Sequence, residues 1–234
     1  MKGLHCFYAF RKANRSIFCS FSTMSFSDLS FIEVKDLRNP SVLFHEWIQE
    51  AKMCGGQTSL MNLATASKNG KVSNRTVAIR EIIPDASLAF TAQANSNKIK
   101  DINENPQVAA TILIPYVKNG KNVLKQIRLS GIAEKLSQEQ CKIYFEKESL
   151  SSKIRSWICQ KCGPVEWNDL KREHDKFLKE VVENKKVIEM PETQVAYKIV
   201  PYEFDFYFSE GETIADRVLF KLLDAQWNCQ RIMT

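Results

Sequence analysis

The chain has 234 residues, of which 44% are hydrophobic, and this is enough apolar material for one sizeable core. No apolar run approaches the ~20 residues that a membrane-spanning helix needs, so we expect no membrane partner. The formal charge is +6, but Lys2, Arg11, Lys12 and Arg15 lie in a first segment without acids and leave only +2 for the rest. This distribution argues against a nucleic-acid-binding face on the folded body.

Residues 1–24 are rich in Phe, Ser and Arg and lack Asp and Glu, which is the composition of an organellar targeting segment. A disordered extension with an alternative start at Met24 is the other interpretation, and both stay open. We expect residues 25–234 to form a single domain, in mitochondria or in the cytoplasm. The seven cysteines form an odd set without a regular framework, which suits a reducing compartment.

A helix is predicted over residues 41–53, because Leu43, Phe44, Trp47 and Ile48 recur at helical spacing. Segments of β-rich character follow, and turn signals such as Asn69-Gly70 separate them. We expect strands over residues 58–66, 72–82, 87–92, 107–115 and 123–135.

Helices interrupt this series of strands. A short one runs from Lys98 to Asn105, and backbone N–H groups at its start favour an anion. A capping-box pattern at Ser137 opens another that continues through Glu148, and a third covers residues 166–184. Three further strands are expected at the end of the chain. Many antiparallel strands with inserted helices predict a mainly β fold, a β-barrel or split barrel whose open ends the helices cover.

Basic and amide-bearing residues recur on consecutive predicted strands. Arginine forks pair bidentately with phosphate oxygens, a lysine adds a point charge, and a glutamine can both donate to and accept from a heteroaromatic ring edge. A phosphorylated ligand is therefore expected. The residues are Arg75 and Arg80, then Phe90-Thr91 followed by Lys98, then Gln126 and Arg128.

Arg75 and Arg80 differ by an odd number of positions, so on an undistorted strand they point to opposite faces. A bulge, or a ligand that lies across the strand end between subunits, would reconcile them.

The order and spacing of these residues resemble the pyridoxamine (pyridoxine) 5'-phosphate oxidase family, and the resemblance extends from Asn39 onward. It implies an antiparallel FMN-binding split barrel that forms a homodimer with FMN at the subunit interface. Arg75 and Lys98 would hold the FMN phosphate, Gln126 would face the ring, and Tyr207 would replace a Trp. The residues implied for cofactor binding are Arg75, Thr76, Val77, Ala78, Arg80, Phe90, Thr91, Lys98, Gln126, Arg128, Lys161, Cys162, Tyr207 and Arg217.

Several positions depart from the family pattern. On the flavin side, Asn97 replaces an Arg, and Lys161-Cys162 replaces Gln-Ser. On the substrate side, Glu148 replaces an Arg that holds the substrate phosphate, which argues against efficient capture of a phosphorylated pyridine. Arg80, Tyr144 and Ser152 keep their roles there, while Thr213 and Ala215 replace an Arg and a His that flank the substrate ring.

The resemblance implies an FMN-dependent oxidase in pyridoxal 5'-phosphate (vitamin B6) synthesis or salvage, with a phosphorylated pyridine as small-molecule partner. It transfers a hydride from substrate to flavin N5, with O2 as the final acceptor, and requires no catalytic side chain. The alternative is a catalytically weak paralogue that binds flavin or a B6 vitamer without turnover.

Cys159 and Cys162 have the spacing of half a zinc site. No second CxxC exists, and His5, His45 and His174 are scattered along the chain. Chance spacing is the better interpretation, and no metal is expected.

Overall fold

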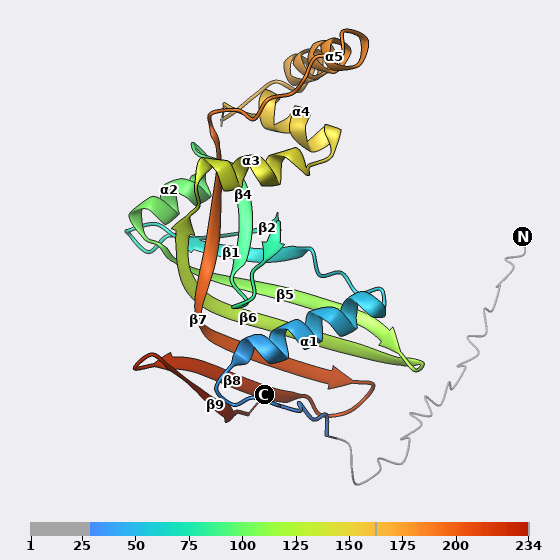
Figure 1. Cartoon of the computed structure of the whole chain (residues 1–234), viewed down its shortest axis with the longest axis vertical. Coiled ribbons are helices and arrows are strands. Elements are labelled where there is room, and N and C mark those ends of the chain that lie inside the picture. The colour runs from blue at the N-terminus through green and yellow to red at the C-terminus, as the bar shows by residue number, and fades with distance from the viewer. Residues whose placement is uncertain (1–28, 162, 234) are drawn as a thin grey trace, which may run out of the picture.

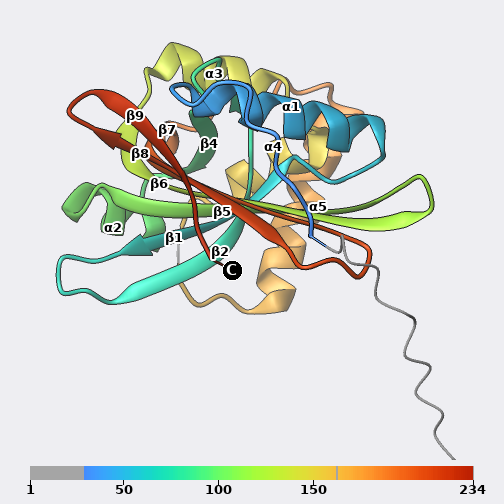
Figure 2. The same cartoon turned by 90° about the horizontal axis from the view of Figure 1, so that it is seen from below.

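The computed structural model describes residues 29–161 and 163–233 (Figure 1). The predicted targeting or disordered segment, residues 1–24, lies outside them. Helix α1 (Pro40–Met53) is capped by Asn39, whose side chain accepts a hydrogen bond from the Ser41 N–H at 3.1 Å. Its apolar face buries Phe44 and Trp47, as the helical spacing predicted. Figures 1 and 2 show α1 lying along one face of a curled sheet.

The sheet is antiparallel throughout, and its strands follow the order β2-β1-β5-β6-β7-β4-β3, with β8 pairing on β7 and β9 on β8. Residues of β2 and β4, near the two ends of this order, line one cavity, so the sheet curls until those strands approach each other. The predicted mainly β barrel with added helices is confirmed. The strands are β1 (Leu60–Ala66), β2 (Val72–Ala78), β3 (Glu81–Ile82), β4 (Leu88–Gln93), β5 (Gln107–Lys118), β6 (Lys121–Lys135), β7 (Gln194–Glu210), β8 (Asp216–Leu223) and β9 (Gln226–Arg231).

Strand β7 changes neighbours along its length. Residues 194–199 pair with β4, whereas residues 203–208 pair with β8, and β6 runs alongside both parts. The register between β6 and β7 shifts at Ser130/Gly131, opposite this change. A Cβ on Gly131 would stand 2.6 Å from the Val200 carbonyl oxygen, so only glycine allows this approach. We call β4 with residues 194–199 of β7 the β4 half of the sheet. The β8 half is β8 with residues 203–208 of β7 and the part of β6 before Gly131.

Helices α3 (Gln138–Glu146), α4 (Leu150–Ile158) and α5 (Trp167–Glu183) gather at the end of the molecule opposite β8 and β9 (Figure 1). The helix predicted from Ser137 through Glu148 is confirmed as α3, which ends at Glu146, whereas helix α4 was not predicted. The Ser149 hydroxyl accepts a hydrogen bond from the Ser152 N–H and caps α4. Among the helices of the described residues, none is both long and apolar enough to cross a bilayer.

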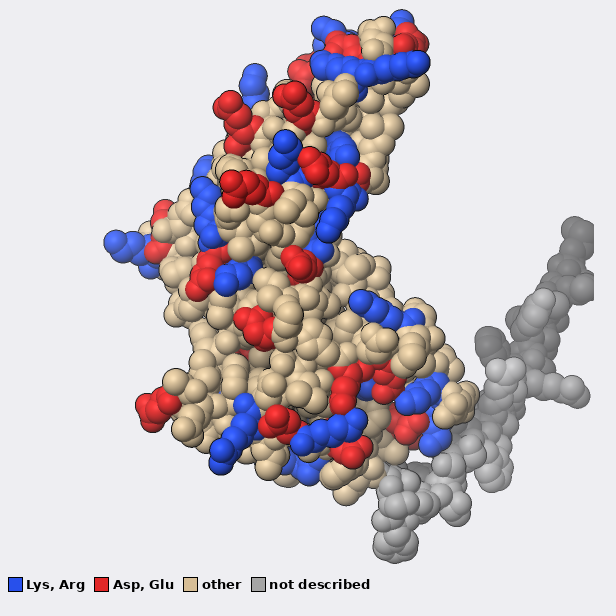
Figure 3. Space-filling view, in the orientation of Figure 1, with Lys and Arg blue, Asp and Glu red and all other residues tan. Residues whose placement is uncertain are grey.

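The core lies between α1 and the inner face of the sheet. Trp47 meets Phe206 edge to face, with ring centroids 5.2 Å apart, and Phe206 stacks on Phe204 at 5.7 Å. These fully packed rings fix the frame from which the candidate site is built. On the outside, Lys and Arg alternate with Asp and Glu over the face that Figure 3 shows.

Candidate functional site

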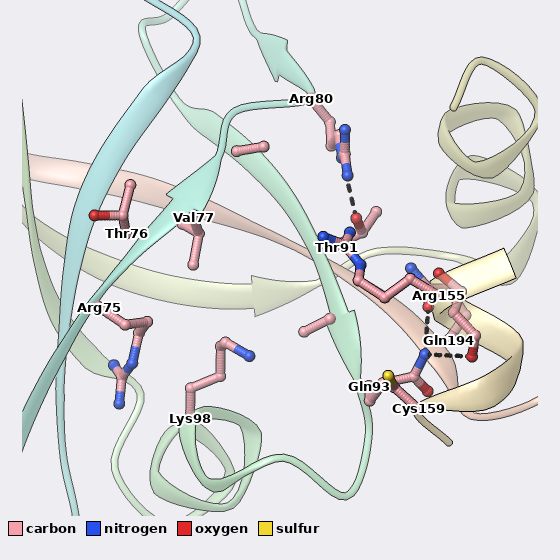
Figure 4. Close-up of a pocket in the computed structure, with 13 residues that line it drawn as sticks. Arg75, Thr76, Val77, Arg80, Thr91, Gln93, Lys98, Arg155, Cys159 and Gln194 are labelled. Atoms are coloured by element: carbon pink, nitrogen blue, oxygen red, sulfur yellow. Dashed lines mark hydrogen bonds between the residues drawn. The ribbon is translucent and has the colours of Figure 1, made fainter. Parts of the chain in front are cut away.

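A cavity of about 320 Å³ opens between β2, β4, the start of β7, α4 and α2 (Asn97–Glu104) (Figure 4). This volume lies in the range of small-molecule sites. Seven of the residues implied by the resemblance line it, namely Arg75, Thr76, Val77, Ala78, Arg80, Thr91 and Lys98.

Arg75 is held in place from two neighbouring elements. Its Nη1 donates to the Leu63 carbonyl oxygen at 3.1 Å and to Thr65 Oγ1 at 2.8 Å, both on β1. Its Nη2 lies 4.0 Å from Asp101 Oδ2 on α2, and Thr65 donates to the same oxygen at 2.6 Å. Burial lowers the pKa of the Arg75 guanidinium and Asp101 opposes that shift, so the group stays a fixed, partly desolvated cation.

Arg80 reaches the same cavity because the predicted continuous strand over residues 72–82 is broken. Strand β2 ends at Ala78. The Ile79 N–H still donates to the Ser59 carbonyl oxygen beside the start of β1, whereas the Arg80 N–H donates to the Ala89 carbonyl oxygen on β4. Arg80 Nε then donates to Thr91 Oγ1 at 3.1 Å. This break resolves the parity conflict between Arg75 and Arg80 within one chain.

Lys98 lies in the first turn of α2, two residues after Ser96, the N-cap. Its Nζ is 3.4 Å from Ser96 Oγ. Figure 4 shows the Lys98 and Arg75 side chains on the same side of the cavity, which combines two cations with a helix N-terminus. An anionic group is the chemistry that this side of the cavity suits.

The rest of the lining was not anticipated from the sequence. Gln93 and Gln194 are register partners of β4 and β7, and Gln93 Nε2 donates to the Gln194 side chain at 2.9 Å and to the Ser156 carbonyl at 3.0 Å. Arg155, on α4, extends across the cavity toward Thr91 in Figure 4. No local pattern could have found these residues, since pairing of distant segments brings them together. The unanticipated residues are Ala92, Gln93, Arg155, Ser156, Cys159 and Gln194.

A second group of implied cofactor residues lies on β6, β7 and β8, in the β8 half. Gln126 is the register partner of Tyr207, which in turn faces Arg217 on β8. Arg217 Nε donates to Asp205 at 2.8 Å, and Arg128 Nη1 lies 3.2 Å from the same carboxylate. None of these residues lines the cavity of its own chain.

Of the three remaining implied cofactor residues, two lie away from the cavity and one is not among the residues that the structure describes. The Phe90 ring is fully buried in the core and stacks on Tyr197, with centroids 6.1 Å apart. Lys161 lines a separate hollow between α4 and α5. Cys162 lies outside the described residues, so the spacing of the cysteine pair is not tested.

Of the substrate-side residues implied by the resemblance, only Arg80 lines the cavity. Tyr144, which is buried, donates its hydroxyl to Glu81 at 2.5 Å, and burial together with this bond raises the pKa of Tyr144 to about 12. At the start of α4, Ser152 Oγ lies 3.2 Å from Ser149 Oγ, which donates to it. Thr213 and Ala215 are both in the connection between β7 and β8, and neither lines the cavity of its own chain.

Comparison with known families places the chain. The family model of pyridoxamine 5'-phosphate oxidase matches residues 48–191, more than half of the sequence. The chain belongs to this family. Among curated relatives, the pyridoxine/pyridoxamine 5'-phosphate oxidase of Acinetobacter baumannii (strain SDF) is 26% identical over 212 residues, covering 90% of this chain and 94% of the relative. A probable pyridoxamine 5'-phosphate oxidase of Schizosaccharomyces pombe is 28% identical over 202 residues, with 83% and 85% covered.

Two solved structures share the fold. PhzG from Burkholderia lata 383, in complex with tetrahydrophenazine-1-carboxylic acid, gives a TM-score of 0.75 at 19% identity and covers 88% of this chain and 100% of its own. A pyridoxamine 5'-phosphate oxidase-related, FMN-binding protein from Nostoc punctiforme gives 0.60 at 19% identity, with 82% and 97% covered. The predicted split barrel is confirmed by both.

Proposed function

We propose that this protein binds FMN in the cavity between β2, β4, α2 and α4 and is an FMN-dependent oxidase of a small amine or alcohol. The observation that carries the proposal is the convergence of Arg75 and Lys98, from two different elements, on one side of that cavity. When bound, FMN would accept a hydride from the substrate carbon at N5 and pass the electrons to O2.

The donor set of the cavity fits this cofactor. A phosphate ester needs charge-assisted donors, which Arg75 and Lys98 would supply, and the Asp101 contact keeps the Arg75 fork oriented. Thr76, Val77 and Ala78 present a strand beside the same cavity, where the cofactor would pack. The role of the protein is to bind, orient and desolvate, and no side chain is assigned as acid or base.

We also propose that the active form is a homodimer whose site is completed by the second copy. The implied ring-facing residues Gln126, Tyr207 and Arg217 lie outside the cavity of their own chain. A two-fold arrangement that set the β8 half of one copy against the cavity of the other would unite both groups of residues.

The names of the curated relatives make pyridoxine and pyridoxamine 5'-phosphates the first substrates to test, with a role in vitamin B6 synthesis or salvage. PhzG, which has the same fold, was crystallised in complex with a carboxylic acid of a different chemical class. Family membership therefore supports the oxidase chemistry, whereas the fold singles out no substrate.

The test is to purify the full chain, record its visible absorbance for bound flavin, and follow peroxide after adding pyridoxine or pyridoxamine, each with and without the 5'-phosphate. We expect a yellow protein that makes peroxide with at least one of them. A protein that takes up no FMN at micromolar concentration would contradict the proposal.

The second candidate function is a catalytically weak paralogue that binds flavin or a B6 vitamer without turnover. One observation favours it: Glu148 forms an ion pair with Arg80, a cation that the resemblance assigns to substrate binding. Bound flavin without peroxide from any of the four compounds would support this candidate over the oxidase.

A further inference from the structure

The Glu148 side chain is buried at the Arg80 end of the cavity, with 2% of its surface exposed. Its Oε1 lies 2.6 Å from Arg80 Nη2 and 3.4 Å from Thr91 Oγ1. Both partners line the cavity. The chain between α3 and α4 therefore places a buried carboxylate directly behind two residues of the cavity wall, although Glu148 itself does not line the cavity.

This contact neutralises one of the two arginines at this end of the cavity. Arg80 is paired with Glu148, whereas Arg155 extends toward Thr91 in Figure 4. A phosphate that bound Arg80 would meet the Glu148 carboxylate and would have to displace it. Like charges a few ångströms apart in a partly buried site repel strongly, so a phosphate is disfavoured at this end.

The second oxygen of the same carboxylate points to what the site accepts instead. Glu148 Oε2 is buried and has no hydrogen-bond partner among the described residues. A buried carboxylate oxygen without a donor is costly, and native structures almost always satisfy such atoms. A ligand N–H or O–H that reached Oε2 would remove that cost.

We infer that Glu148 makes the Arg80 end of the cavity select a substrate that carries an amine or hydroxyl donor there and reject one that carries a phosphate. The inference rests on the proposed function, since it takes the substrate to occupy the same cavity as the cofactor. Glu148 is then a specificity-determining residue, and its substrate class is an unphosphorylated amine or alcohol.

The experiment compares pyridoxamine with pyridoxamine 5'-phosphate by titration calorimetry on the purified full chain supplied with FMN. We expect the wild-type protein to bind pyridoxamine at least about tenfold more tightly. Glu148→Gln removes the charge, so it should improve binding of the phosphate ester at least about tenfold relative to pyridoxamine. Glu148→Asp keeps the charge and should keep the preference.

Glu146→Gln is the matched control, because it removes the same charge from an exposed glutamate two residues away, at the end of α3. It should leave the preference unchanged. If Glu148→Gln does not fold, which its melting curve would reveal, the wild-type and Glu148→Asp preferences still decide the question.

Three results would overturn the inference: a wild-type preference for the phosphate ester, as capture by Arg155 would produce; binding of neither compound; or equal preferences in wild type and Glu148→Gln. The flavin absorbance that stays with the protein after unbound FMN has been removed from the same samples separates the two proposals. A yellow protein that prefers the phosphate ester refutes this inference alone, whereas a colourless protein that prefers pyridoxamine refutes the flavin proposal alone.

Discussion

Mixing two inactive variants tests whether two copies of the chain share one site. Arg75→Gln removes the cation at the cavity, and Gln126→Glu changes the β8 half, where a carboxylate could only accept hydrogen bonds. Loss of the charge-assisted Arg75 contact costs about 1.5–3 kcal/mol, so Arg75→Gln alone should bind FMN roughly 10- to 150-fold more weakly. Gln126→Glu should also weaken FMN binding, because it loses the amide N–H donor and leaves a ring acceptor facing a carboxylate. Both positions should tolerate the change, since neither side chain belongs to the buried core.

The fraction of sites that should regain wild-type affinity in the mixture can be calculated. If each site takes its Arg75 from one copy and its Gln126 from the other, a mixed dimer holds one intact site and one doubly altered site. Random reassembly of equal amounts makes about half of the dimers mixed, so about a quarter of all sites should regain wild-type affinity. The assay is quenching of FMN fluorescence at a concentration that saturates the wild type but not the variants.

The matched control replaces Arg172, an exposed arginine on α5 paired with Asp169. Arg172→Gln alone should bind FMN like wild type, and mixing it with Arg75→Gln should give no more than the average of the two. The reasoning is refuted if the Arg75 and Gln126 variants bind weakly alone and their mixture regains nothing, because the site would then lie within one chain.

Two further predictions concern stability. Although its partial burial acts the other way, Glu50 has a pKa lowered to about 2 by hydrogen bonds from Tyr116 and from lysines that include the buried Lys125. The stabilisation of the folded state by ionised Glu50 is complete above the unfolded pKa of 4.5 and is lost as the pH falls toward 2. Because 30% of the side chain is exposed and solvent screens its charge, this stabilisation amounts to about 1–2 kcal/mol. In urea unfolding, Glu50→Gln should be less stable than wild type by that amount at pH 7, with the gap closing below pH 4.5; a constant gap would contradict this. Gly131→Ala should lower the free energy of unfolding by about 1–3 kcal/mol, because its Cβ would stand 2.6 Å from the Val200 carbonyl oxygen, and an unchanged melting temperature would show that β6 and β7 can separate without cost.

Most of the fold could be predicted because its signals are local. The apolar spacing from Leu43 to Ala51 and the turn at Asn69-Gly70 each depend on a few neighbouring residues, and the structure confirms both. Helix α4 was missed, although Ser149 is a good N-cap, because the helix buries only Ile154 and Ser156 and so carries little apolar spacing.

The candidate site was predictable only in part, for a related reason. Arg75, Thr91 and Lys98 stood out because their order and spacing resemble a family pattern. Gln194 and Arg155 did not, since they enter the cavity through pairing of β4 with β7 and through α4, which are long-range features. The Glu148 contact with Arg80 likewise needed coordinates, because the sequence alone allowed that side chain to turn into water.

The change of neighbours along β7 also bears on how this chain can diverge. The cavity cations Arg75 and Lys98 lie on β2 and α2, whereas Gln126 and Tyr207 lie in the β8 half, beyond the irregularity at Gly131. Substitutions that change which ligand binds at one of these two surfaces can therefore accumulate while the other surface keeps its residues. A scaffold divided in this way gives natural variation, or a protein engineer, two nearly independent surfaces to reshape.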